Sequence, residues 1–195
     1  MRALKRGILV LPVVALLAGA CSSDSTGSTS NESGSLDFSY AGDVTGTYSV
    51  SGVARLVGGV PSGQFAAALT QAASGGGTFI SIGAFRPGGV PRTDAVFIDL
   101  PATTGPTTVT VCATAATCAG VEMLFGLNTT LNTVDTDYVL TSGTVVVSTV
   151  SSTRVTGTFS GTGVRVDTNG QAVAGSTFTI TNGHFDTPVR NDLGL

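Results

Sequence analysis

Two stretches of the sequence nearly repeat each other, VTGTYSVSGV at residues 44–53 and VTGTFSGTGV at residues 155–164, with seven of ten positions identical. A duplicated domain would carry the similarity outward, but the residues that follow, ARLVGGVPSG and RVDTNGQAVA, do not align. Each copy places one aromatic residue, Tyr48 or Phe159, among Thr, Ser and Gly, in the alternation typical of a half-buried strand. We therefore predict that the two stretches form long strands that face one core. In one arrangement the two strands are neighbours in the same sheet.

The same strand pattern continues through most of the chain. It is rich in Thr, Val, Ser and Gly, and its short apolar runs end at Gly, Pro, Asn or Asp. Residues 64–73, QFAAALTQAA, fit a helix as well as a strand, because alanine favours helices. Further strands are expected at 47–56, 64–70, 78–85, 95–100, 107–112, 120–127, 138–141, 144–150, 155–166 and 176–181.

Many short strands without a long helical period predict an all-β domain with antiparallel strands. A β-sandwich is the favoured architecture and a barrel is the alternative. One domain is expected over residues 36–190, with a short C-terminal tail at 191–195.

The N-terminus is typical of an export signal. Residues 1–20 begin with basic side chains and continue with an apolar run at 8–17, which is shorter than the roughly 20 residues that a membrane-spanning helix needs. The sequence LAGAC at 17–21 resembles the bacterial lipoprotein signal, although Ala18 stands where that family more often has Leu. The resemblance implies cleavage before Cys21 and lipid on Cys21; a plain secretory signal, with Cys21 an ordinary residue, is the alternative.

The lipoprotein resemblance also implies a location. A diacylglyceryl group supplies the two acyl chains that stable anchoring needs. Ser22 follows Cys21, so the Asp that retains such proteins at the inner membrane is absent, which implies the outer membrane of a two-membrane bacterium. Residues 22–35 contain no apolar side chain, so we expect 21–35 to form a flexible, disordered tether.

Loss of the signal peptide removes three of the nine basic residues and leaves six against twelve acidic residues. No lysine remains in the mature chain, and its six arginines are scattered: Arg55, Arg86, Arg92, Arg154, Arg165 and Arg190. The absence of a basic stripe argues against nucleic acid as a partner.

Two cysteines remain after Cys21, and disulfides persist in exported proteins. On one extended strand Cys112 and Cys118 would lie about 20 Å apart, whereas a disulfide needs Cα atoms within about 4.4–6.8 Å. Residues 113–117 must therefore reverse the chain, with a hairpin as the expected form. Since CxxC spacing and nearby soft metal ligands are absent, we predict a structural disulfide.

Candidate chemistry is sparse. His184, the single histidine, follows an expected strand, and a surface position is the simpler interpretation. Asp94 and Asp99 would face opposite sides of a strand, which does not suit a glycosidase pair. No nucleophile, nucleotide or zinc motif occurs. We therefore predict no catalytic residue, no cofactor and no enzyme, with a hydrolase as the least favoured class.

Two binding alternatives stay open. Asp135 and Asp137 share one strand parity and could bridge a calcium ion, although a solvated loop is the simpler interpretation. Glycan binding usually uses flat aromatic faces, but the chain has no Trp, and its Phe residues fall in apolar strand patterns that predict packing.

A wider resemblance concerns the C-terminal part of the chain. GTFS at 157–160, followed by ITNGHFD at 180–186, looks like the end of small bacterial envelope lipoproteins of unknown function. The resemblance implies a β-sandwich and no assigned chemistry. The sequence thus predicts a lipid-anchored cell-envelope protein that acts as a structural or protein-interaction module, with a glycan- or calcium-binding module as the alternative.

Overall fold

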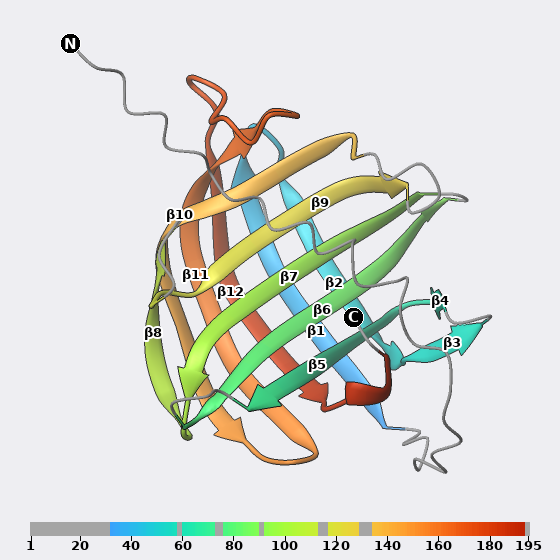
Figure 1. The fold of residues 1–195 in the computed structure, drawn as a ribbon. Helices are drawn as coiled ribbons and strands as arrows, with labels where there is room; N and C mark the ends of the chain where they lie inside the picture. Colours follow the sequence, from blue (N-terminus) through green and yellow to red (C-terminus); the bar gives the residue numbers. More distant parts are fainter. Residues whose placement is uncertain are drawn as a thin grey trace.

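The computed structural model describes residues 32–57, 60–72, 76–89, 92–112, 117–128 and 134–193, and most of them are in strands (Figure 1). The strands are β1 (Ser33–Gly42), β2 (Gly46–Val53), β3 (Arg55–Val57), β4 (Val60–Ser62), β5 (Phe65–Ala72), β6 (Thr78–Gly89), β7 (Arg92–Thr103), β8 (Thr107–Cys112), β9 (Gly120–Asn128), β10 (Thr136–Val150), β11 (Arg154–Val166) and β12 (Phe178–Pro188). The expected signal peptide, Cys21 and residues 22–31 of the expected tether lie outside the described residues. Among the described residues, no helix has the length and apolar character to cross a membrane.

Ten strands form one antiparallel sheet in the order β2-β1-β12-β11-β10-β9-β7-β6-β5, and β8 pairs with β10 beyond the end of β9. The sheet curls so that β5, β6, β7 and β9 lie in front of β1, β2, β11 and β12 (Figure 1). The all-β, antiparallel prediction is confirmed. The favoured sandwich is not confirmed, because these strands belong to one continuous sheet that nearly closes like a barrel.

The C-terminal segment, residues 189–193, joins β5 at the edge that faces away from β6. Val189 bridges Ala68, and the Arg190 amide donates to the Ala68 carbonyl at 2.8 Å. The Thr70 amide donates to Asn191 Oδ1 at 2.8 Å. Without these bonds, β5 would be a free edge strand. The C-terminal segment therefore satisfies part of the edge of β5.

The C-terminal segment also covers the outer face of β5. Leu193, in the short 3₁₀ helix Asn191–Leu193, packs with Phe65 and Ala67. The Arg190 guanidinium is buried, donates to the Ala54 carbonyl at 2.9 Å and pairs with Asp192 at 2.8 Å. The expected tail at 191–195 therefore contributes residues 191–193 to the packed domain.

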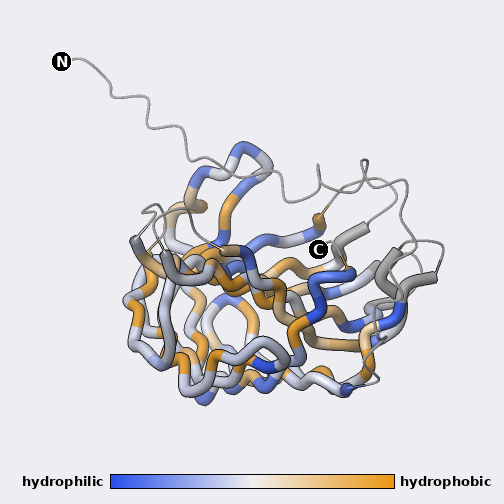
Figure 2. The backbone as a smooth tube through the Cα atoms, turned by 60° about the horizontal axis from the view of Figure 1, so that its bottom comes forward, coloured by the Kyte–Doolittle hydropathy of each residue, from blue (hydrophilic) through white to orange (hydrophobic). Residues whose placement is uncertain are grey.

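Aromatic rings are prominent in the core inside the curled sheet. Hydrophobic and hydrophilic residues alternate along much of the backbone (Figure 2). Phe38 stacks on Tyr48 with ring centroids 5.2 Å apart, and Tyr138 stacks on Phe178 at 4.4 Å. The Tyr48 hydroxyl donates to the Ala84 carbonyl at 3.0 Å. Such ring pairs add about 0.5–1.5 kcal/mol beyond their buried area.

The two nearly repeated stretches meet the same packing requirement in two different strands. The two copies lie in β2 and β11, and Tyr48 and Phe159 belong to the same core, as predicted. They are not neighbours, because β1 and β12 lie between them. In each copy the glycine faces a ring on the next strand, since Gly46 pairs with Tyr40 and Gly157 pairs with Phe185. A glycine leaves room for that ring to lie across the backbone.

Several elements differ from the sequence predictions, which did not include β1 or β4. β1 begins at Ser33, so residues 33–35 of the expected tether lie in the sheet. The ambiguous 64–73 segment is strand β5 at 65–72. The two strands expected at 138–141 and 144–150 are one strand, β10, which continues through a register shift near Gly143 (φ 145°).

Candidate functional site

A groove of about 520 Å³ crosses the outer surface of β10, β11 and β12. We call it the polar groove; its side chains are mainly hydroxyl, amide and imidazole groups, namely Thr144, Thr158, Ser160, Thr181, Asn182 and His184. The hydroxyls of the threonines and of Ser160 make no side-chain hydrogen bond within the described part of the chain. The polar groove can therefore offer hydrogen-bond donors and acceptors to a small molecule.

Irregular strand pairing forms the polar groove. The β11–β12 register shifts between Phe159 and Gly161, and Asn182 has φ 53°, the only positive value for a non-glycine residue in the described ranges. A Cβ at Gly183 would lie 2.7 Å from Phe159 Cδ1, so glycine is needed where the strands cross that ring. The GTFS and ITNGHFD motifs thus form adjacent walls of one groove, in which Thr158 pairs with His184.

His184 lies on the outer surface, as the simpler interpretation predicted. Its Nδ1 is 3.9 Å from Asp37 Oδ1, and both side chains are about half exposed. No described Ser or Cys side chain hydrogen-bonds to His184, so the described residues do not form a nucleophile–histidine pair.

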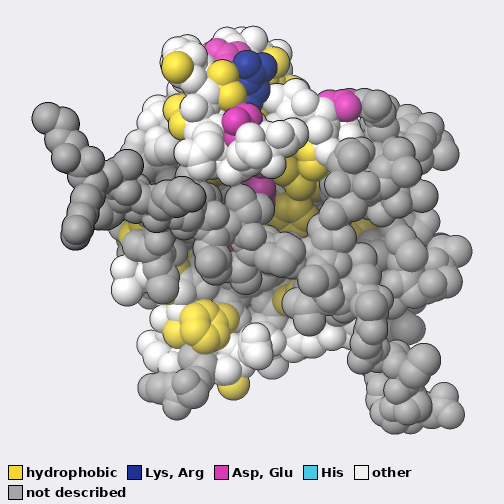
Figure 3. All heavy atoms as spheres, turned by 45° about the horizontal axis from the view of Figure 1, so that its top comes forward, with side chains coloured by type: hydrophobic (Ala, Val, Ile, Leu, Met, Phe, Trp, Pro, Cys, Tyr) yellow, Lys and Arg dark blue, Asp and Glu magenta, His cyan; other side chains and the backbone are white. Residues whose placement is uncertain are grey.

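A second feature of the outer surface is unusual because outward-facing strand positions there are apolar. We call it the outer apolar face; its residues are the partly exposed Phe85, Phe97, Leu124, Val139 and Val164, together with Ala95, which is buried. Their strand neighbours, such as Val96, Met123 and Tyr138, belong to the interior core, so alternation turns these residues outward. Figure 3 shows hydrophobic side chains next to acidic side chains, with a basic side chain nearby, on the part of the surface that is not drawn grey.

Two carboxyl groups lie within the outer apolar face. Glu122 stands in the cross-strand row between Phe97 and Val139, and Asp137 pairs with Leu124 in the next row. Glu122 and Asp137 are hydrogen-bonded to each other. Burial, together with the neighbouring Glu122, raises the pKa of Asp137 to about 8, and burial also raises the pKa of Glu122.

Neither Glu122 nor the outer apolar face was predicted from the sequence. Phe85 and Phe97 were assigned to packing, whereas their rings meet on the outside of β6 and β7, with centroids 5.6 Å apart. The sequence of β9 did contain a pattern that indicates an outward position for Glu122, because Glu122 and Leu124 alternate with Val121 and Met123. Without the strand register, nothing showed that apolar residues flank Glu122 on both sides.

The calcium candidates do not form a ligand group in the described residues. Asp137 bonds to Glu122, while Asp135 packs against Gly126 at the start of β10. Among the described residues no three His, Cys, Asp or Glu side chains are placed to hold a metal ion. The calcium interpretation of Asp135 and Asp137 thus has no support from this geometry.

Asp94 and Asp99 are held by different partners. Asp94 pairs with Arg86 at 2.8 Å, and the Arg86 guanidinium lies 4.7 Å from the centre of the Tyr48 ring. Asp99 accepts a hydrogen bond from Ser81 on the outer surface. The two carboxylates therefore do not face each other across a cleft, in agreement with the opposite-face prediction.

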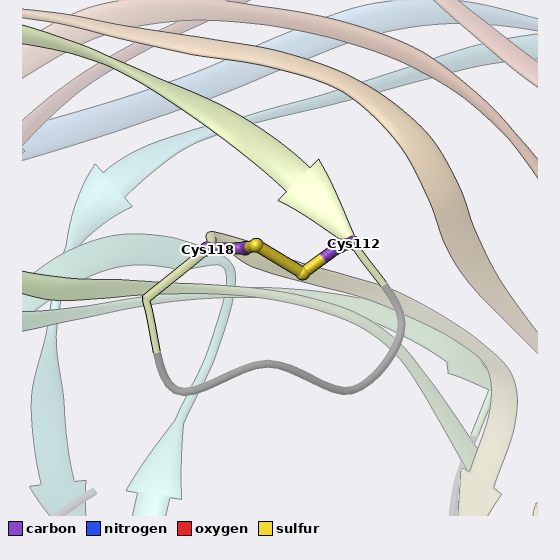
Figure 4. The surroundings of a disulfide bond; sticks show 2 residues. All are labelled: Cys112 and Cys118. Carbon is purple, nitrogen blue, oxygen red and sulfur yellow. A yellow bond between two sulfur atoms is a disulfide. The ribbon is translucent and has the colours of Figure 1, made fainter.

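Cys112 and Cys118 form a disulfide with a Cα–Cα distance of 5.7 Å, as their spacing predicted (Figure 4). The expected hairpin is wrong, because β8 and β9 do not pair with each other and both pair with β10. Instead, Ala119 runs parallel to the end of β8, and its carbonyl accepts from the Cys112 amide at 3.1 Å. The disulfide thus fixes β8 to the start of β9.

The chain matches no protein-family model, no curated protein and no solved structure. The resemblances to lipoproteins remain predictions, and function has to be argued from the surface of this molecule.

Proposed function

We propose that this chain is a lipid-anchored protein of the cell envelope that acts as a protein-interaction module. The observation that carries this proposal is the outer apolar face. Outward positions of a sheet that contacts water are usually polar, and contiguous apolar patches mark interaction sites on soluble proteins. These side chains are partly buried, and a partner that covers Phe85, Phe97, Leu124 and Val139 would remove their remaining exposed surface from water.

Site-specific photo-crosslinking in intact cells tests this proposal. A photoreactive residue at Phe97 or Val139 should form a defined adduct with another envelope protein. Val146 is the matched control, because it is an apolar residue on the outside of β10, 37 % exposed, and lies outside the outer apolar face. Equal crosslinking at Val146 and Phe97, or none at Phe97 and Val139, would contradict the proposal.

The anchor is tested separately. Cys21 is the proposed lipid attachment site, so radiolabelled palmitate should enter the protein and Cys21→Ala should abolish that label. In a two-membrane bacterium the labelled protein should fractionate with the outer membrane. A Cys21→Ala protein that stays labelled would refute attachment at this residue.

The polar groove favours a second candidate function, glycan binding. Its volume is in the range of small-molecule sites, and its hydroxyl, amide and imidazole groups suit a neutral sugar. Titration with neutral trisaccharides should shift the amide signals of Ser160 and Asn182 in NMR spectra. The Thr158→Val variant should weaken this response, whereas Thr156→Val, outside the groove, should not. Sugar-induced shifts located elsewhere would exclude the groove as the site.

A further inference from the structure

We propose that the outer apolar face recognises a segment of a partner protein that carries one lysine or arginine among apolar side chains, with the cation paired to Glu122 and Asp137. This inference rests on the proposed interaction function and specifies the chemistry of the partner.

The strand register places the two carboxyls in the middle of apolar rows. One row runs Phe97–Glu122–Val139–Val164 across β7, β9, β10 and β11. The neighbouring row contains Ala95, Leu124 and Asp137. A segment that lies across these rows would therefore contact apolar side chains on both sides of the Glu122–Asp137 pair. To match them, the segment needs a cation at its centre and apolar side chains on either side.

One oxygen of the acidic centre lacks a partner. Asp137 Oδ1 is inaccessible to solvent and has no hydrogen-bond partner among the described residues. A buried acceptor without a donor costs about 1–3 kcal/mol. Because solvent does not reach this oxygen in the structure, the Asp137 side chain must turn outward before a cation can bind it. An ammonium or guanidinium group then supplies several donors and a complementary charge to both carboxyls.

The chain offers few cations of its own. Three arginine side chains in its described part are paired with nearby acids, in the pairs Arg86–Asp94, Arg154–Asp186 and Arg190–Asp192. Arg55 and Arg165 are exposed and form no ion pair among the described residues, so a second copy of the chain is the competing source of an arginine. The sequence after residue 21 contains no lysine, so a lysine would have to come from a different protein.

The charged groups around the centre predict a pH dependence of binding. Asp99 faces the centre from β7, Glu122 comes from β9 and Asp137 from β10, while β11 contributes only Val164 and Val166. The carboxyl pair retains a proton near neutral pH, because the pKa of Asp137 is about 8. A bound cation replaces this proton, which passes to the solvent, so affinity for the cation should rise as the pH increases through that value.

Binding of synthetic peptides to the full-length protein, held in lipid nanodiscs, tests the inference by surface plasmon resonance. The probe is a short peptide of alternating valine and threonine with lysine at its centre, and the comparison peptide has glutamine there. We expect the lysine peptide to bind roughly tenfold or more tightly than the glutamine peptide. This preference should disappear in the Glu122→Gln, Asp137→Asn double variant and persist in Asp37→Asn, which neutralises an acid elsewhere on the surface.

The possible results separate the two proposals. If both peptides bind equally and Phe97→Ser weakens both, the outer apolar face is an interaction site but the role of the carboxyls is wrong. A lysine preference that survives the double variant also refutes this inference. If neither peptide binds and photo-crosslinking at Phe97 fails, both proposals are wrong. A lysine preference that grows between pH 6 and 9 in the unmodified protein, and not in the double variant, would support the inference.

Discussion

At the scale of single residues, contacts between glycines and aromatic rings determine where strands of this sheet can approach. Gly157 faces inward on β11, where a Cβ would collide with the Phe185 ring and with the Val146 carbonyl. Gly120 on β9 is different, because a Cβ at that position would have Asp99 Cβ as its nearest neighbour, 4.0 Å away. The two glycines therefore have different structural roles although both lie in strands.

This difference predicts the effects of alanine at the two positions. Gly157→Ala should lower the free energy of unfolding by about 1–3 kcal/mol, because the core must shift to accept the methyl group. Gly120→Ala should leave stability unchanged or raise it by about 0.4–1 kcal/mol through the unfolded state. Urea unfolding of both variants checks this prediction, and equal destabilisation would contradict it.

The Glu122–Asp137 pair predicts how stability depends on pH. Asp137 has a pKa of about 8 in the folded protein and an ordinary value of 3.8 when unfolded, so between these values the folded state binds more protons than the unfolded state. The free energy of unfolding should therefore fall as the pH rises from about 4 to 8. Asp137→Asn should flatten this dependence, and Asp167→Asn serves as the control, because hydrogen bonds from the Gln171 and Asn169 amides hold the pKa of Asp167 below this pH range. Thermal melting across this pH range provides the measurement.

Part of this residue-scale detail was predictable from the sequence. Alternation along residues 44–53 and 155–164 was sufficient to predict that Tyr48 and Phe159 face the core. The match of Gly157 with Phe185 and the meeting of Glu122 with Asp137 were not predictable, because both depend on which strands are neighbours and in what register. The disulfide was predictable because two cysteines remain after Cys21, without CxxC spacing or nearby soft metal ligands. Their separation added that residues 113–117 must reverse the chain.

At the scale of elements, the C-terminal segment acts as a strap that holds the edge and the outer face of β5. The Arg190 guanidinium joins the Ala54 carbonyl to Asp192, and Asn191 caps the Thr70 amide. Residues 189 and 190 were predicted to belong to the domain and residues 191–195 to form a tail. The role of the segment depends on contacts with distant residues, which sequence pattern does not reveal.

Arg190→Ala should weaken the attachment of the C-terminal segment to β5. The loss of charge-assisted hydrogen bonds should lower the free energy of unfolding by roughly 1.5–3 kcal/mol. Hydrogen exchange of the Thr70 amide should accelerate, because its acceptor on Asn191 would no longer be held in place. Arg165→Ala, on β11, is the control. Unchanged exchange at Thr70 would show that Asn191 stays in place without Arg190.

Removal of the Cys112–Cys118 disulfide should affect the β8–β9 connection. Cys112→Ser with Cys118→Ser should lower the free energy of unfolding by about 2 kcal/mol, since the closed loop is short. The Ala119 amide, which donates to the Thr110 carbonyl at 2.9 Å, should then exchange faster than amides of β11. Uniform acceleration across the sheet would instead indicate global loss of structure.

At the scale of the whole molecule, β12 joins the N-terminal strands β1 and β2 to the rest of the sheet. It pairs with β1 on one side and with β11 on the other. The sequence predicted many antiparallel strands correctly but could not decide between a sandwich and a nearly closed sheet. That choice depends on the pairing of β1 with β12, between residues far apart in sequence.

Two truncations test this connection. A chain that ends at residue 176 lacks β12 and should not fold, because β1 and β2 lose their link to β11 and the core loses Phe178, Ile180 and Phe185. A chain that ends at Pro188 should still fold and melt at a lower temperature, since it lacks only the C-terminal segment. Far-UV circular dichroism with thermal melting distinguishes these outcomes, and native-like melting of the shorter chain would disprove the central role of β12.

The pairing of Ala68 with Val189 has a consequence for biogenesis. If the chain crosses a membrane from its N-terminus, as proposed, β5 emerges long before residue 189. During that interval the edge of β5 that residues 189–193 later pair stays open, although the rest of the sheet can already form. Chaperones that shield unpaired strands would then act on this edge until the last segment docks.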